Sequence, residues 1–191
     1  LSHVPQVLLM SLTLENNNLM VENVVLVDPE DRPLGTMEKM EAHRQGVLHR
    51  AFSVFVFNSK GDLLLHRRAK EKYHSGGLWT NTCCSHPRPD ETVVEAAQRR
   101  LVEEMGMRCQ LEPKFSFVYR ADLDHGMIEH ELDHVLIGYS DVPPEPNPEE
   151  VCETRYMPVR EVEADIAAHP DHYTAWFKIC FPEVVSTLIR A

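Results

Sequence analysis

Alternating acidic residues are the first feature of this sequence that points to chemistry. Glu129 and Glu131 flank His130, and Asp133 continues the alternation, so an extended segment would place the three carboxylates on one face. Carboxylates this close repel one another and raise at least one pKa unless a cation lies among them. The same pattern is also typical of the solvated face of an edge strand. The segment alone leaves both interpretations open.

Three histidines lie outside any periodic apolar stripe. His43 and His49 are six residues apart across a glycine, and His86 lies in a segment flanked by glycine and proline. Three imidazoles with carboxylates would suit a divalent transition metal such as Mn²⁺ or Zn²⁺. The alternative is that these are ordinary surface or core histidines among the eleven in the chain.

Adjacent cysteines mark the segment 80–87, Thr-Asn-Thr-Cys-Cys-Ser-His-Pro. A nearby histidine or metal lowers the pKa of a thiol and makes it reactive. In an extended segment Cys84 and His86 share a face, which favours Cys84 as the working thiol. The five cysteines form no framework, so we expect a reducing compartment. The others are expected to be buried and inert: Cys83, Cys109, Cys152 and Cys180.

The segment 85–106 has the most specific spacing in the chain. Five residues separate Ser85 from Glu91, seven more lead to Arg99, and Arg-Leu-Val-Glu-Glu-Met-Gly follows. This resembles the Nudix box, in which a loop–helix–loop presents glutamates to divalent metal on a diphosphate. Ser85 stands where the box opens with glycine, and Arg100 stands where a glutamate is usual.

The arginine at position 100 has a chemical consequence. Hydrolysis by Nudix enzymes needs several glutamates to hold Mg²⁺ around the phosphate and activate water. Arg100 removes one such ligand and adds a positive charge, so with Glu104, four residues on, the helix would hold a diphosphate but lose hydrolytic power. The alternative is two solvated ion pairs, Arg99–Glu103 and Arg100–Glu104.

The elements that must position these residues follow from apolar periodicity and turn residues. Thr92 and Glu95 form a capping box, apolar residues recur every four positions, and Gly106 occupies a C-cap position, which together predict a helix over 92–106. Segments 50–57 and 62–66 predict a β-hairpin. Residues 69–88 predict a long functional loop. Further strands are expected at 24–27, 115–121, 131–140 and 151–157, and helices at 38–43, 159–168 and 173–190.

Strands and helices in this mixed order predict an α/β (α+β) sandwich. The 191 residues suit one domain, placed at 21–191 behind a leader or extension at 1–20. With 19 basic and 30 acidic side chains the net charge is −11, which disfavours nucleic acid and anionic lipid as partners. No apolar run approaches the ~20 residues that cross a bilayer, and no signal peptide is recognised, so we expect a cytoplasmic protein.

The chain resembles the type I isopentenyl-diphosphate isomerases of the Nudix superfamily from about residue 24 onward. Most specific are the run 80–87 and the Glu-x-Glu some forty residues later, and the modified Nudix box also occurs in that family. Other matching segments are 38–39, 43, 48–52, 67–68, 79, 119–121 and 176.

The resemblance implies a Nudix-type mixed sheet between helices, and it implies a role for each matching residue. His43, His49, His86, Glu129 and Glu131 resemble the ligands of a tightly held Mn²⁺ or Zn²⁺. Glu104 resembles the ligand of a Mg²⁺ that arrives with the substrate, and Lys39, Arg68, Lys72 and Arg100 resemble a diphosphate clamp. Cys84 and Glu131 correspond to the two catalytic groups, Tyr119 to a helper in proton delivery, and Trp176 to an aromatic wall.

The implied activity is conversion of isopentenyl diphosphate into dimethylallyl diphosphate through a tertiary carbocation, in isoprenoid biosynthesis. The expected partner is this small diphosphate alone, bound by a monomer or weak homodimer. The alternatives are a Nudix hydrolase, a non-catalytic metal- or ligand-binding module and, least favoured, a Cys–His hydrolase. No Gly-rich dinucleotide fingerprint is present, which disfavours a flavin-dependent version of the reaction.

Overall fold

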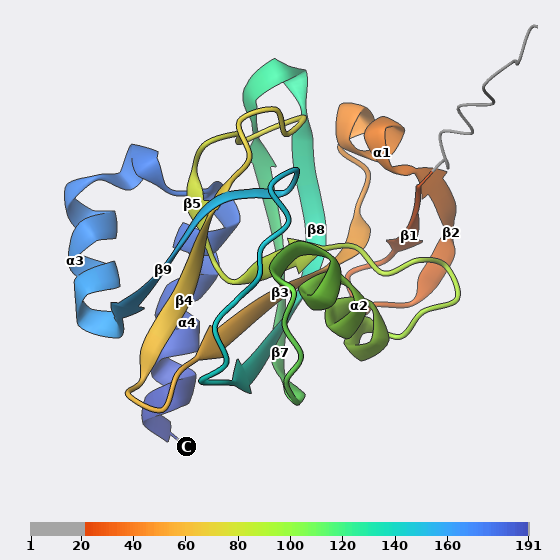
Figure 1. Cartoon of the computed structure of the whole chain (residues 1–191). Helices are drawn as coiled ribbons and strands as arrows, with labels where there is room; N and C mark the ends of the chain where they lie inside the picture. The colour runs from red at the N-terminus through yellow and green to blue at the C-terminus, as the bar shows by residue number, and fades with distance from the viewer. Residues whose placement is uncertain (1–21, 191) are drawn as a thin grey trace, which may run out of the picture.

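A nine-stranded mixed sheet lies between helices in the computed structural model, which describes residues 22–190 (Figure 1). The predicted leader at 1–20 lies outside the described residues. The strands are β1 (Asn23–Val27), β2 (Pro33–Glu38), β3 (His49–Phe57), β4 (Asp62–Arg68), β5 (Trp79–Thr80), β6 (Cys83–Ser85), β7 (Leu111–Asp122), β8 (Ile128–Tyr139) and β9 (Val151–Pro158). The helices are α1 (Lys39–Gln45), α2 (Val93–Met105), α3 (Val159–Ala168) and α4 (Ala175–Arg190).

Alternation along β3 builds a core on each face of the sheet. Val54 and Val56 pack with α2 on one face, whereas Phe55 and Phe57 pack with α4 on the other. Figure 1 shows α2 and α4 on opposite sides of the strands. Both faces of β3 are therefore buried, as the predicted sandwich requires. No helix within residues 22–190 has the length and apolar character needed to cross a membrane.

Helix α2 begins and ends as its sequence predicts. Thr92 and Glu95 exchange both capping-box hydrogen bonds, and Gly106 ends the helix with φ +61°. A Cβ at Gly106 would lie 2.5 Å from the carbonyl oxygen of Glu145, so this C-cap admits only glycine. The helix that carries the modified box is thus fixed at both ends.

The predicted hairpin of β3 and β4 is wrong beyond its turn. The two strands pair only at Phe57 and Leu63, after which Thr82 enters between them. Its hydroxyl accepts from the backbone N–H of Val56 (2.8 Å) and donates to the carbonyl of Leu64 (2.7 Å). Thr82 therefore supplies hydrogen bonds that a continuous hairpin would make between its own strands.

The predicted loop at 69–88 accordingly contains two short strands. β6 pairs with β3 through Ser53 and Cys84, while β5 pairs with β4. The remaining edge of β3 pairs with β8 in parallel, from His49 opposite Glu131 onward. Residues far apart in the sequence thus meet on the two sides of β3. β2, which pairs with β1, was not predicted.

Candidate active site

One cavity collects most of the side chains singled out in the sequence. Those lining it include Lys39, Arg68, Lys72, Cys84, His86, Arg100, Glu129, Glu131 and Trp176. Four of them are cations, and the thiol and the carboxylates come from strands on opposite sides of β3. Tyr119 and Glu104 are hydrogen-bonded to side chains that line this cavity. Tyr119 bonds to Glu129 and Glu131, and Glu104 bonds to Arg100.

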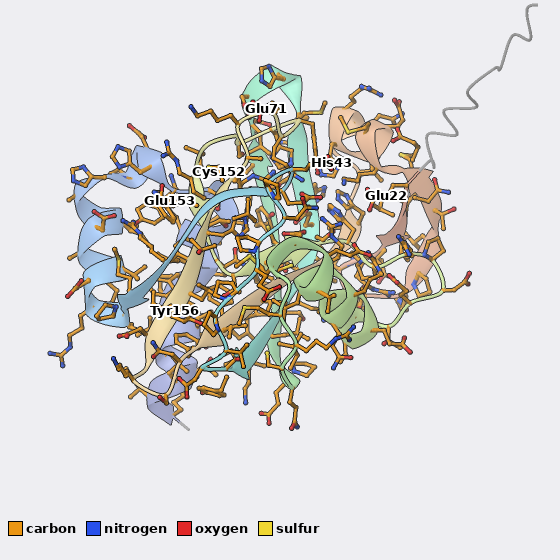
Figure 2. The ribbon with its side chains drawn as sticks, viewed as in Figure 1. Glu22, His43, Glu71, Cys152, Glu153 and Tyr156 are labelled. Atoms are coloured by element: carbon orange, nitrogen blue, oxygen red, sulfur yellow. The ribbon has the colours of Figure 1, made fainter. Side chains whose placement is uncertain are left out.

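Three imidazoles converge on Glu131. Its Oε1 lies 2.9 Å from His86 Nε2, 3.5 Å from His49 Nε2 and 3.9 Å from His43 Nε2, and all four residues are buried. The ligand atoms of the four lie within 4.8 Å of one another. Helix α1 supplies His43 (Figure 2), while β3, the segment after β6 and β8 supply the others. We call these four residues the imidazole cluster.

The tautomers of the imidazole cluster favour a cation at its centre. Nδ1 of His43 donates to the carbonyl of Lys39 (2.7 Å), and Nδ1 of His49 donates to the carbonyl of Val47 (2.8 Å). Because a carbonyl only accepts, Nδ1 carries the proton of each neutral ring, and Nε2 then presents a lone pair to the cluster. His43 Nε2 is buried without a hydrogen-bond partner, and His49 Nε2 lies 3.3 Å from His86 Nε2. This donor set fits a divalent metal ion.

Burial favours the neutral form of His43 and His86, the form that a metal ligand must have. It lowers the pKa of His43, and it lowers the pKa of His86 to about 3 although Glu131 opposes the shift. For Glu131 burial acts to raise the pKa, but the close approach of the His49 and His86 imidazoles outweighs it and holds the pKa well below its usual range. Neutral rings of His43 and His86 beside the ionised Glu131 carboxylate form a site suited to a cation.

Tyr119 connects the two glutamates of β8. Its hydroxyl lies 2.9 Å from Glu129 Oε2 and 2.7 Å from Glu131 Oε2. Burial and these carboxylates raise the pKa of Tyr119, so the phenol stays protonated and can donate. Burial and the neighbouring Glu131 also raise the pKa of Glu129. The predicted shared face of Glu129, Glu131 and Asp133 is confirmed as a buried face rather than a solvated one.

The cations differ in how they are held. Lys39 pairs with Glu22 at 2.8 Å; Glu22 lies beside α1 in Figure 2. Both Lys72 and Arg100 pair with Glu150. Arg68 is 6% exposed and, among residues 22–190, forms no ion pair. Its Nη2 donates to the carbonyl of His74 (3.1 Å), and its Nε has no hydrogen-bond partner. Arg68 is therefore the cation most in need of an anion.

Both ion pairs that offered an alternative explanation of the box are formed. Arg99 contacts Glu103 at 3.1 Å, and Arg100 contacts Glu104. Arg99 also binds Glu91, away from the cavity, whereas Arg100 reaches the cavity lining. Burial raises the pKa of Glu104 although Arg100 opposes the shift. One pair is thus peripheral and the other belongs to the site.

The remaining cysteines are placed partly as expected. Cys83 and Cys180 are buried, Cys109 is half-buried, and Cys152 is exposed, so the prediction of a buried thiol is wrong for Cys152.

Burial raises the pKa of Cys84, which is therefore a thiol at neutral pH, and Arg68 opposes that shift. In β6 alternation directs Cys83 into the α2 core and Cys84 toward the cavity.

Sequence reasoning missed several residues of the site. His74 and Tyr73 line the cavity, and Glu150 holds two of its cations. Tyr73 and His74 lie in the long loop between β4 and β5, where the sequence has no periodic pattern. Glu150 directly precedes β9, where a polar residue is ordinary. Only their contacts in the folded chain identify them.

Comparison with known proteins places the chain in a family. Residues 47–177 match the NUDIX domain. The chain is 54% identical over 161 residues to the isopentenyl-diphosphate Delta-isomerase of Pectobacterium atrosepticum, covering 84% of this chain and 90% of that protein. It is 50% identical over 167 residues to isopentenyl-diphosphate Delta-isomerase 2 of Aromatoleum aromaticum, covering 87% and 88%.

Solved structures support the fold. DR0079 from Deinococcus radiodurans superposes with a TM-score of 0.65 at 23% identity, covering 77% of this chain and 90% of that one. The MutT protein from Methanosarcina mazei Go1 superposes with a TM-score of 0.58 at 20% identity, covering 71% of this chain and 91% of that one. These likenesses confirm the predicted Nudix-type sandwich. The sequence relatives above show that the chain belongs to the isopentenyl-diphosphate Delta-isomerase family, and the match over residues 47–177 shows that it is built on a NUDIX domain.

Proposed function

We propose that this protein converts isopentenyl diphosphate into dimethylallyl diphosphate by adding a proton at one carbon and removing one from another. The observation that carries the proposal is a thiol, Cys84, and a carboxylate, Glu131, on one cavity that four cations also line. The names of the sequence relatives support the same activity.

The reaction conserves atoms. The terminal CH₂ of the alkene receives a proton, and its π electrons form the new C–H bond and leave a tertiary cation. Loss of a proton from the adjacent chain CH₂ then forms the internal double bond. Cys84 and Glu131 supply one acid and one base, and their roles exchange in the reverse direction. Tyr119, hydrogen-bonded to Glu131, serves in proton delivery.

The donor set supports a divalent transition-metal ion in this proposal, and the family resemblance adds a Mg²⁺ that binds with the substrate. His43, His49, His86, Glu129 and Glu131 would hold Mn²⁺ or Zn²⁺. Glu104 would hold Mg²⁺ brought by the diphosphate, as the family resemblance implies. A bound divalent cation supplies positive charge that favours the ionised form of its carboxylate ligands. The chain itself orients Glu131, through His86 and Tyr119.

The diphosphate lies against Lys39, Arg68, Lys72 and Arg100, with Arg68 as the main anchor. We predict that Arg68→Gln raises KM for isopentenyl diphosphate about 10- to 100-fold, because a charge-assisted hydrogen bond contributes about 1.5–3 kcal/mol. The matched control is Arg67→Gln, since Arg67 is more exposed and pairs with Glu153 instead. Steady-state kinetics check this, and equal KM values in the two variants would contradict it.

Trp176 forms an aromatic wall that stabilises the carbocation. Its side chain is buried on the cavity, donates to Asn81 Oδ1 (3.2 Å) and lies 5.2 Å from the Arg68 guanidinium. We predict that Trp176→Phe retains part of kcat while Trp176→Ala loses most of it, since a desolvated cation–π contact is worth about 2 kcal/mol, or ~30-fold. Trp79→Phe is the control, because Trp79 faces Arg155 at 4.1 Å. Equal kcat for the two Trp176 variants would count against this role.

Proton NMR of isopentenyl diphosphate in D₂O with Mg²⁺ tests the function directly. We expect the dimethylallyl isomer to appear with deuterium incorporated. Release of phosphate or monophosphate from assorted diphosphates, without isomer, would instead identify a hydrolase. Arg100 disfavours that outcome, because it stands where the Nudix box usually has a glutamate and so removes a carboxylate that a hydrolytic metal cluster would use.

A further inference from the structure

His74 is a buried histidine that the imidazole cluster does not include. It lies in the loop between β4 and β5, is 2% exposed and lines the cavity. Its ring stacks on His43 at 5.7 Å between centroids and meets Trp176 edge-on at 5.9 Å. His74 therefore lies between the imidazole cluster and the aromatic wall.

The ring nitrogen Nε2 of His74 faces a carboxylate without forming a hydrogen bond. It lies 3.4 Å from Glu129 Oε1 and is buried with no hydrogen-bond partner, as is His43 Nε2. One ligand atom each from His43, His74 and Glu129 lie within 4.8 Å of one another. A buried nitrogen in this position costs free energy unless a cation or a proton joins it to the carboxylate.

The backbone around His74 holds this orientation. Its carbonyl accepts from Arg68 Nη2 (3.1 Å), and its Nδ1 lies 3.2 Å from Ser75 Oγ. The N–H of Ser75 donates to Asp124 Oδ1 (2.8 Å), and Ser75 adopts φ +51°, a left-handed conformation that non-glycine residues rarely take. Contacts from Arg68 and Asp124, together with the strained backbone at Ser75, aim the imidazole at Glu129.

We propose that Nε2 of His74 is an additional ligand of the divalent transition-metal centre, on the side of His43 and Glu129. The inference rests on the metal centre of the proposed function and adds one imidazole to its five residues. If Nδ1 of His74 donates to Ser75 Oγ, Nε2 presents a lone pair, as His43 and His49 do. The opposite tautomer would make His74 a hydrogen-bond donor that only orients Glu129.

Cobalt(II) distinguishes the two roles, because its visible absorption depends on the number and geometry of its ligands. The full-length protein and its His74→Gln and His74→Phe variants are stripped with a chelator and reloaded with Co²⁺ or Zn²⁺. We expect both variants to shift the Co²⁺ bands and to bind Zn²⁺ at least ~100-fold more weakly in competition with a chromophoric chelator. A Co²⁺ spectrum unchanged in both variants overturns the proposal, whatever the affinity.

Two further variants make either result decisive. His66→Gln is the matched control, because His66 is equally buried but bonds to the carbonyl of Thr82 outside the centre. His49→Gln removes a member of the imidazole cluster. If His49→Gln loses Zn²⁺ and His74→Gln behaves like His66→Gln, only the inference about His74 fails. If none of the variants changes Zn²⁺ binding, the proposed metal centre fails with it. Thermal unfolding shows whether His74→Phe folds, and His74→Gln preserves polarity and size if it does not.

Discussion

Cys84→Ala is expected to lower kcat for isomerisation by about 10³-fold, within the range typical of a lost general acid or base. The thiol lines the cavity from β6, and its raised pKa keeps it protonated at neutral pH. Substrate binding is expected to stay within a few-fold, because the cations that hold the diphosphate are untouched. Isomerisation rates and isothermal titration with isopentenyl diphosphate measure the two effects separately.

The adjacent cysteine provides the matched control. Cys83→Ala removes the same atom from a fully buried side chain that packs in the α2 core. That change is expected to destabilise the fold modestly and to leave kcat nearly unchanged. If the two alanine variants had equal kcat, Cys84 would have no catalytic role, and the binding-module alternative would gain support.

Glu131→Gln is expected to lose both metal binding and catalysis. Neutralising this carboxylate leaves three imidazoles without their shared anion and removes the charge from one acceptor of the Tyr119 hydroxyl. We expect affinity for Mn²⁺ or Zn²⁺ to fall by at least ~100-fold and kcat by about 10³-fold or more. Metal analysis after dialysis, followed by assays at saturating metal, separates the roles, because restored occupancy is not expected to restore the rate.

Asp133→Asn is the control for this change. Asp133 lies two residues further along the same buried face of β8, and its Oδ2 accepts from Ser53 Oγ (2.7 Å). Its carboxyl belongs to neither group of potential ligands. We expect metal content to be retained. Full recovery of kcat in Glu131→Gln on adding metal would show that Glu131 acts only as a ligand.

Local patterns in the sequence determined helix α2 and the identity of the reactive side chains. Capping residues act within one turn, and side chains on a strand alternate strictly, so Thr92, Gly106 and the shared face of Glu129 and Glu131 could be predicted without any tertiary contact. The spacing of the modified box likewise placed Arg100 and Glu104 one turn apart. The family resemblance supplied the ligand set, which no local period encodes.

Only the tertiary structure decided how these residues meet. Thr82 lies between β3 and β4 and bonds to the backbone of both, so the two strands separate. β6 then pairs with the edge of β3 that the predicted hairpin had assigned to β4. The contact of His74 with Glu129 joins residues 55 positions apart, and that of Glu150 with Lys72 joins residues 78 apart. Such contacts depend on how the strands of the whole sheet pair and on which side chains this pairing buries. Sequence periodicity, in contrast, shows only which residues of a single helix or strand share a face.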